Sequence, residues 1–386
     1  MRTLNRDERE SLTQLRRELH RLAEPSGAER ATAARIVDEL TSLGPDSIVE
    51  GLGGHGVAAE LRADEDGRTV LIRADLDALP IAETIPLEHA SASANVAHKC
   101  GHDGHMAIVL GVARRFAANR PARGRLVVLF QPAEETGEGA ASVIADPAFE
   151  TLRPDIALAV HNLPGFELGG VVVRSGPFAC SSRGLTVDVD GATSHAAEPD
   201  KGRSPALAVA QIIEAWTAAR QLFTGLGESV QATVIHASVG RRAFGTSPGT
   251  GCVMATLRAT SDRAIDRLEA RLRVAAQRIA DAYELSTSFG RHEIFPATVN
   301  HPDVVRVVTE AARALEMETI EPVGPFAWSE DFGHFSGLCP AALIGLGAGL
   351  ETPALHHPTY DFPDPLIAHG VALLEATIRH WLGTNG

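Results

Sequence analysis

The chain has 386 residues, with 49 acidic and 35 basic side chains that give a formal net charge of −14. This length predicts two or three domains with room for large hydrophobic cores, and the acidic balance disfavours nucleic acid or an anionic membrane surface as a partner, because both are bound through basic patches. The 4 scattered cysteines provide no disulfide framework, and no apolar run reaches the ~18 residues of a membrane span. The charged N-terminus lacks the apolar stretch of a secretory signal, so we expect a cytoplasmic location.

Alternating helices and strands make up the first part of the chain. Leucines spaced three or four residues apart predict a helix over 7–24, ended by Pro25, and a second helix is predicted over 29–43. Strands are predicted at 56–61, 69–73, 126–130 and 156–160, with helices at 105–118 and 139–144. The last two strands are continuously apolar, as strands covered on both faces must be. This alternation predicts an α/β sheet sandwiched by helices.

The pattern changes from about Arg183. Strands at 185–189, 229–238, 252–259 and 285–289 and helices at 204–222 and 261–283 follow in the order strand, helix, strand, strand, helix, strand. That order is typical of a ferredoxin-like unit. Helices at 303–315 and 365–382, around a strand at 341–346, then resume the α/β pattern. We therefore predict an α/β domain in two parts, 1–181 and 293–386, interrupted by an inserted α+β domain over 182–292.

The strongest concentration of reactive side chains is His98-Lys99-Cys100-Gly101-His102-Asp103-Gly104-His105, at the start of a predicted helix. A cysteine and a histidine two residues apart can turn toward one cation, and thiolate with imidazole suits Zn²⁺ and related ions. A polar loop with a helix cap at Asp103 is the alternative. The clustering of ligand types favours a metal site.

A pair of carboxylates, Glu134 and Glu135, follows the apolar strand at 126–130. In open α/β sheets, ligands bind beyond the carboxyl ends of the strands. Adjacent carboxylates point in different directions, so one can bind a cation while its neighbour transfers protons. An acidic helix start, favoured by the helix dipole, is the alternative.

Three further groups of candidate metal ligands are weaker signals, and they too belong to the predicted α/β domain. His161 and Asp77 each follow a predicted strand, and His356 and His357 stand late in the chain. All belong to the predicted α/β domain, so we expect them to share one edge of the sheet.

The sequence resembles the M20 metallopeptidase superfamily, and most of all its amidohydrolase branch of N-acyl-amino-acid aminoacylases, hippurate hydrolases and auxin-conjugate hydrolases. The motifs that carry the resemblance span nearly the whole chain and are RADLDALP, HKCGHDGH, FQPAEE, AVHN, GATSHAAEP, SEDF and LHHP. The resemblance implies an α/β metallo-exopeptidase-like catalytic domain, with helices around a mixed sheet. It also implies that the inserted ferredoxin-like domain is a lid and dimerisation domain.

The resemblance also implies roles for individual residues. One or two divalent ions (Zn, Mn, Co or Ni) would be held by Cys100 as a bridging ligand and by His102, Glu135, His161 and His356. His356 is preferred to His357 because the family histidine stands two residues before the proline. The resemblance further implies that Glu134 is the general base and that the Asp77 carboxylate supports one of the metal ligands. It also implies that His195 stabilises the oxyanion and that Arg258 contacts the substrate carboxylate.

The inserted domain departs from the family at 244–251, where Phe-Gly-Thr-Ser-Pro-Gly-Thr-Gly replaces an Asn-Val-Ile-Pro-like stretch. Backbone N–H groups, Thr246 or Ser247 would have to replace the missing amide. Glu330 and Asp331 follow Ser329, a predicted helix N-cap, so we interpret them mainly as capping groups that favour the helix dipole, with support of a metal ligand as the alternative.

The function expected is metal-dependent hydrolysis of the amide bond of a small-molecule N-acyl amino acid or dipeptide-like substrate, in a homodimer or higher homo-oligomer formed through the lid. In the family, the lid histidine, here His195, can reach a neighbouring subunit's active site. Three alternatives stay open. They are a dipeptidase or carboxypeptidase-type M20 exopeptidase, an amidase with Cys100 as nucleophile, and a metal-binding scaffold without catalysis.

Overall fold

The computed structural model describes residues 4–223 and 229–384 and divides into two compact units. The first comprises Met1–Phe178, Thr298–Gly324 and Asp331–Gly386, and the second comprises Ala179–Ala297 and Pro325–Glu330. No sequence pattern sets the short segment Pro325–Glu330 apart from its neighbours. The separate folding of 182–292 as a domain stays a prediction.

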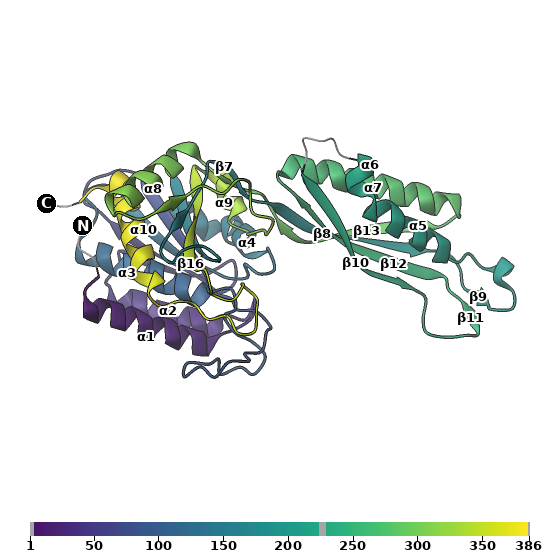
Figure 1. The fold of residues 1–386 in the computed structure, drawn as a ribbon, viewed down its shortest axis with the longest axis horizontal. Coiled ribbons are helices and arrows are strands. Elements are labelled where there is room, and N and C mark those ends of the chain that lie inside the picture. Colours follow the sequence, from purple (N-terminus) through teal and green to yellow (C-terminus); the bar gives the residue numbers. More distant parts are fainter. Residues whose placement is uncertain (1–3, 224–228, 385–386) are drawn as a thin grey trace. The chain divides into compact units, whose positions relative to one another are not determined.

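An eight-stranded mixed sheet forms the centre of the first unit, in the order β1-β2-β4-β3-β5-β16-β6-β15 (Figure 1). Its strands are β1 (Ser47–Leu52), β2 (Gly56–Arg62), β3 (Thr69–Asp75), β4 (Arg125–Gln131), β5 (Ile156–Pro164), β6 (Val171–Val172), β15 (Thr319–Ile320) and β16 (Ala341–Gly349). Neighbouring strands among β4, β3, β5 and β16 pair in parallel, so their carboxyl ends meet at one edge. β3 is buried along its whole length, which confirms that both faces of the sheet are covered.

Helices cover this sheet. They are α1 (Arg6–Leu22), α2 (Arg30–Ser42), α3 (His102–Ala118), α4 (Gly139–Ala145), η1 (Pro147–Leu152), α8 (Pro302–Ala314), α9 (Gly333–Leu338) and α10 (Leu366–Leu382). α3 packs on β3 and β4, with α1 and α10 against it. α10 comes close to α3 at Gly111, where an added Cβ would lie 2.5 Å from Val371. A capping box between Asn5 and Glu8 begins α1.

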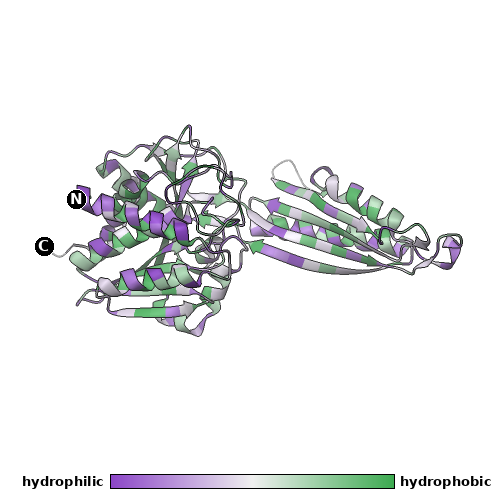
Figure 2. Cartoon of the chain, turned by 90° about the horizontal axis from the view of Figure 1, so that it is seen from below, coloured by the Kyte–Doolittle hydropathy of each residue, from purple (hydrophilic) through white to green (hydrophobic). Residues whose placement is uncertain are grey.

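The second unit has the predicted ferredoxin-like order. Its four-stranded antiparallel sheet runs β10-β12-β8-β13. The elements are β8 (Ser181–Asp190), η2 (Pro199–Lys201), α5 (Ala206–Thr217), α6 (Ala219–Phe223), β10 (Val230–Val239), β12 (Thr250–Ala259), α7 (Asp262–Ala282) and β13 (Ser286–Phe295). Its strands carry alternating hydrophilic and hydrophobic residues (Figure 2), as expected when helices cover only one face. A small ribbon of β9 (Ser194–His195) and β11 (Thr246–Ser247) extends from it.

Several details differ from the sequence-based expectation. The helix predicted over 204–222 is two helices, because α5 ends before Ala218 and α6 begins after it. A two-stranded pair, β7 (Gly176–Ala179) with β14 (Thr298–Asn300), was not expected. Within residues 4–223 and 229–384, no helix is both long and apolar enough to cross a membrane.

Candidate metal centre

The carboxyl edge of the parallel strands gathers most of the residues singled out from the sequence. Asp77 follows β3, Glu134 and Glu135 follow β4, and His161 lies near the end of β5. β3 pairs with β4 and with β5, so these side chains start from neighbouring strands. The expectation that they share one sheet edge is therefore confirmed.

The loop before α3 brings Cys100 and His102 to this edge. Gly101 has a φ of 92°, a left-handed conformation that glycine adopts without strain. An added Cβ there would lie 2.6 Å from Asn162 Oδ1 and 2.8 Å from the Tyr360 hydroxyl. Glycine is thus required for both its backbone conformation and the close packing around it.

The Nε2 atom of His161 faces Cys100, and the Nε2 atom of His102 faces the two glutamates. His102 Nδ1 lies 2.9 Å from the backbone carbonyl of Asp77, and His161 Nδ1 lies 2.9 Å from that of Asn162. A carbonyl oxygen only accepts, so each Nδ1 carries a proton, and each Nε2 can bind a metal ion when the ring is neutral. His161 Nε2 lies 3.5 Å from Cys100 Sγ. This tautomer is the one that metal-binding histidines adopt when their other nitrogen is fixed by a hydrogen bond.

The two glutamates and His356 complete the cluster. His102 Nε2 lies 3.9 Å from Glu134 Oε2 and 3.9 Å from Glu135 Oε1, and His356 Nε2 lies 3.9 Å from Glu135 Oε2. His357 instead bonds its own turn, with Nδ1 2.7 Å from Thr359 Oγ1. The structure therefore brings His356, and not His357, to the carboxylates.

Two non-glycine residues in the left-handed region flank the carboxylates. Ala133 has a φ of 51° and His356 a φ of 66°. The Ala133 N–H donates to the buried carboxylate of Glu29 at 2.8 Å, and the His356 N–H donates to the Lys99 carbonyl at 2.8 Å. Such conformations persist only where surrounding contacts enforce them, and they occur often at functional sites.

The donor set fits a divalent cation. Single donor atoms from Cys100, His102 and His161 lie within 4.8 Å of one another, as do those from His102, Glu134 and Glu135 and those from Cys100, Glu135 and His356. His102 Nε2 is buried and makes no hydrogen bond, although carboxylate oxygens surround it. Burial lowers the pKa of His102, but the Cys100 thiolate and the carboxylates of Asp77 and Asp75 outweigh burial and raise it well above its ordinary value. The cluster therefore favours positive charge at this nitrogen, which a bound divalent cation would supply. Thiolate, imidazole and carboxylate together suit Zn²⁺ and similar ions.

Asp77 lies behind the cluster and is fully buried. Its Oδ2 accepts hydrogen bonds from Ser26 Oγ at 2.7 Å and from the backbone N–H of Glu135 at 3.0 Å. Burial raises the pKa of Asp77, but hydrogen bonds from His102, Ser26 and Glu135 outweigh burial and hold the pKa below its usual value. Asp77 thus stays ionised and fixes both the His102 ring and the backbone of Glu135.

His195 and Arg258 belong to the second unit. His195 is exposed on β9, and its Nδ1 accepts from the backbone N–H of Ala197 at 3.1 Å. Its Nε2 must therefore carry the proton of the neutral ring. Arg258, on β12, donates from Nη1 to the Ala327 carbonyl at 2.9 Å and to Ser329 Oγ at 3.0 Å.

The model of Peptidase family M20/M25/M40 matches residues 71–380. The chain belongs to this family. The N-acetyl-L-cysteine deacetylase of Bacillus subtilis is 28% identical over 96% of this chain and 88% of its own length. The hippurate hydrolase of Campylobacter jejuni is 28% identical over 93% of each chain. A solved Bacillus subtilis structure, described as a dinuclear metal binding peptidase from M20 family, matches with a TM-score of 0.82 and 25% identity, over 99% of this chain and 100% of that one.

Membership in the M20 family, together with these relatives, identifies the chain as a hydrolase of amide bonds. The candidate ligand clusters at the strand ends agree with a metal-binding member of that family.

The interpretation of Asp331 as a cap for the helix that follows it is wrong. α9 begins at Gly333 without a side-chain cap, and Ser329 accepts from Arg258 instead. Asp331 is fully buried and accepts from the backbone N–H of Ala140 in the first turn of α4 at 2.8 Å, as well as pairing with Arg73. It therefore stabilises the start of α4, far away in the sequence.

Sequence analysis missed two basic residues near the candidate metal centre, Arg16 and His20 of α1. Both are fully buried, and His20 Nδ1 lies 2.8 Å from Asp103, the residue after His102. The available signal was a pair of basic residues one turn apart within the apolar stripe of a helix.

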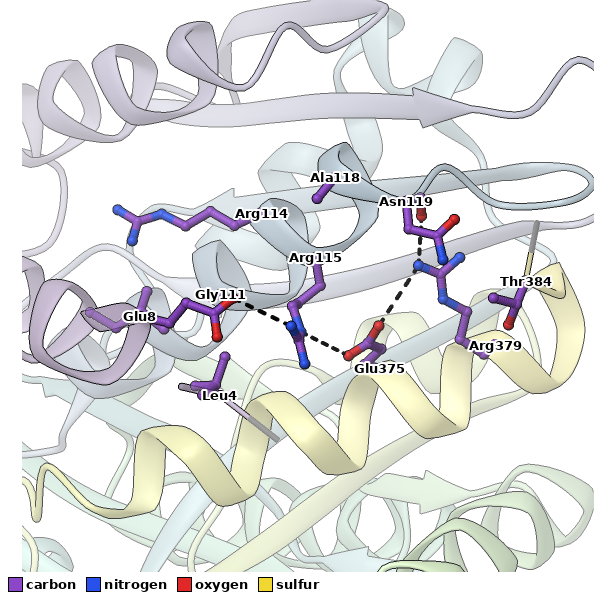
Figure 3. A pocket seen from close by; sticks show the side chains of 11 residues that line it. Leu4, Glu8, Gly111, Arg114, Arg115, Ala118, Asn119, Glu375, Arg379 and Thr384 are labelled. Carbon is purple, nitrogen blue, oxygen red and sulfur yellow. Dashed lines mark hydrogen bonds and ion pairs between the residues drawn. The ribbon is translucent and has the colours of Figure 1, made fainter. Parts of the chain in front are cut away.

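A separate hollow of about 470 Å³ lies among α1, α3 and α10 (Figure 3). Arg115 lies at its centre and pairs with Glu8 at 3.3 Å and with Glu375 at 3.1 Å. The lining includes none of the residues of the candidate metal centre. The hollow is therefore separate from the candidate metal centre.

Proposed function

We propose that the chain is a metal-dependent deacylase of N-acyl amino acids or related small amides, with Glu134 as general base. One observation carries the proposal. Two adjacent carboxylates, Glu134 and Glu135, face Nε2 of His102 at the carboxyl edge of the sheet. A site that only binds a cation has no use for a carboxylate beyond its ligands.

The proposed roles divide the site into ligands and a base. Cys100, His102, Glu135, His161 and His356 would hold one or two divalent ions, of which Zn, Mn, Co and Ni suit these donors. A bound cation would polarise the scissile carbonyl and make water acidic enough to attack near neutral pH. Glu134 then accepts the proton of the attacking water and returns it to the leaving amine.

Substrate contacts come from the second unit in this proposal. His195, with its proton on Nε2, is suited to donate to the developing oxyanion. Arg258 keeps donors beyond the Nη1 group that binds Ala327 and Ser329, and these would contact the substrate carboxylate. Thr246 pairs directly with His195 in the β9–β11 ribbon, which supports its hydroxyl as the replacement for the missing amide of 244–251.

The distance between His195 and Arg258 within one chain supports a homodimer. The ribbon adjoins the Thr250 end of β12, whereas Arg258 lies eight residues further along that strand, roughly 27 Å at about 3.4 Å per residue. No small amide spans that distance. If both residues contact one substrate, His195 must come from a second copy of the chain.

A cysteine nucleophile is less well supported. Burial and the neighbouring carboxylates of Glu135 and Glu134 raise the pKa of the Cys100 thiol well above its ordinary value. Activated cysteine nucleophiles need the opposite shift.

The test is Glu134→Gln, with Glu138→Gln as control, because Glu138 is exposed in the same loop. We expect Glu134→Gln to bind metal as the wild type does and to lose roughly 10²–10⁴-fold in kcat, while Glu138→Gln stays near wild type. Substrates should include N-acetyl and N-benzoyl amino acids and dipeptides, each with Mn²⁺, Zn²⁺ or Co²⁺. Full activity of Glu134→Gln would overturn the proposed mechanism, and preferential cleavage of dipeptides would favour the exopeptidase alternative.

A further inference from the structure

Two basic side chains are buried on the apolar face of α1. Arg16 and His20 lie one turn apart among buried leucines, and neither is exposed to solvent. Burying a guanidinium is unfavourable unless anionic partners and hydrogen bonds replace its water. The partners of these two residues therefore show what this face of the helix is built to hold.

Arg16 joins three carboxylates. Its Nη1 lies 2.7 Å from Asp361 Oδ1 and 3.3 Å from Asp103 Oδ2, and its Nη2 lies 2.7 Å from Asp364 Oδ1. Asp103 belongs to the first turn of α3, whereas Asp361 and Asp364 follow β16 near the end of the chain. One side chain of α1 thus connects two loops that are distant in sequence.

His20 makes a second connection to the same loops. Its Nδ1 lies 2.8 Å from Asp103 Oδ2, and its Nε2 lies 3.0 Å from Glu83 Oε1. The Glu83 carboxylate also binds the buried Lys99 at 2.7 Å, and Lys99 Nζ donates to the Tyr360 carbonyl at 2.8 Å. We call Arg16, His20, Glu83, Lys99 and Asp103 the α1 anchor.

The α1 anchor contains or binds the residues next to three of the proposed metal ligands. Lys99 precedes Cys100, and Asp103 follows His102. The carbonyl of Lys99 also accepts from the backbone N–H of His356, the third ligand, at 2.8 Å. None of the anchor residues is itself a proposed ligand, yet each of the three ligands is at most one residue or one hydrogen bond away from the anchor.

We propose that Arg16 and His20 are positioning residues, which hold the loops of Cys100, His102 and His356 in the arrangement that binds metal. The proposal rests on the proposed function, because it takes those three residues as ligands. The physical reason is that Asp103 is fixed from both sides. Its Oδ1 accepts from the backbone N–H of Gly104 at 2.9 Å, and its Oδ2 is held by His20 and Arg16. Fixed neighbours of a metal ligand strengthen metal binding by reducing the reorganisation that binding requires.

Arg17 provides a matched control. It is the next residue of α1 and also pairs with Asp364, at 2.8 Å, but its side chain is 41% exposed and it does not bind Asp103. Arg16→Met and Arg17→Met therefore remove the same group from the same helix, and only Arg16→Met disturbs the connection to the ligand loop. Arg16→Lys keeps the charge and tests for rescue.

His20 allows an even narrower comparison. The amide nitrogen of asparagine takes the place of Nδ1, and that of glutamine takes the place of Nε2. His20→Asn can thus keep the bond to Asp103, whereas His20→Gln can keep only the bond to Glu83. The comparison of His20→Asn with His20→Gln also tests the α1 anchor if Arg16→Met does not fold.

The measurement is Co²⁺ binding to the metal-free protein, followed by competition with a chromophoric chelator and by the thiolate-to-Co²⁺ absorption band of Cys100. We expect Arg16→Met and His20→Gln to weaken Co²⁺ binding about 10–100-fold and to change the absorption band. Arg17→Met and His20→Asn should stay within about twofold of wild type, and Arg16→Lys should recover part of the loss.

If Co²⁺ affinity and absorption are unchanged in both Arg16→Met and His20→Gln, the positioning role of the α1 anchor is overturned, even if either variant is less stable. The proposed metal centre is not affected by that result. A wild-type protein that binds no Co²⁺ would instead overturn the proposed metal centre, and the anchor with it.

Discussion

Gly101 shows how one residue controls the candidate metal centre. It lies between Cys100 and His102 with a φ of 92°, and an added Cβ would meet the side chains of Asn162 and Tyr360. Any other residue would therefore meet both an unfavourable backbone conformation and a steric clash, in the middle of the ligand loop.

We expect Gly101→Ala to destabilise the metal-free protein by about 3 kcal/mol, because the clash adds to the backbone strain. Gly165→Ala is the control, since Gly165 has a φ of 85° but no atom within 4 Å of an added Cβ. It should cost only about 1 kcal/mol. Urea unfolding of the two variants measures the difference, and equal losses would show that the contacts with Asn162 and Tyr360 do not matter.

Individual residues differ in how well sequence predicts them. Cys100 and His102 stand out because their spacing and chemistry are local features of the chain. Arg16 gives only a weak signal, its place within the apolar stripe of α1, because a basic residue in an amphipathic helix is normally solvated and only the tertiary structure supplies the carboxylates that bury it. Asp331 misleads for the same reason, since the helix that it stabilises is remote in sequence.

At the scale of elements, the contact of α1 with α3 depends on the charge of His20. Burial lowers the pKa of His20, but Asp103 and Glu83 outweigh burial and raise the pKa to about 9. A base with a raised pKa stabilises the fold fully below its unfolded pKa, ~6.5, and loses this contribution as the pH rises through the folded value.

The wild-type protein should therefore lose its stability advantage over His20→Asn between about pH 6.5 and pH 9, by up to about 3 kcal/mol. Urea unfolding of both metal-free proteins at several pH values in this range gives the comparison. A constant difference between them would mean that His20 is neutral throughout, contrary to this assignment.

The elements that sequence predicts best are long and strongly patterned. β4 and β5 are apolar throughout, and α7 combines an amphipathic pattern with a Ser261 cap. β6 and β15 have two residues each and α9 has six, so they contain too few residues to show a period. β1 is half-exposed and carries no clear alternation. These elements depend on pairing with the rest of the sheet.

For the whole molecule, the sheet order explains why the first unit needs distant parts of the chain. β16, from the C-terminal part, lies between β5 and β6 and pairs with both. His356 follows this strand, whereas Cys100, His102 and His161 precede the second unit in sequence. The candidate metal centre therefore forms only when both parts of the first unit have come together.

The proposed dimer gives a prediction at the same scale. Within the second unit, β12 separates His195 from Arg258, so a second copy of the chain would supply His195 to each site. His195→Ala and Glu134→Gln should each be almost inactive alone, with His195→Ala losing roughly 10²–10³-fold in rate.

In a mixed dimer, one site combines Glu134 of the first variant with His195 of the second and is complete. Equal co-expression should restore about one quarter of wild-type activity, because half of the dimers are mixed and each has one complete site. Mixed dimers purified through two different tags should have about half of wild-type activity, because one of their two sites is complete. No recovery, with both single variants inactive, would show that His195 acts within its own chain.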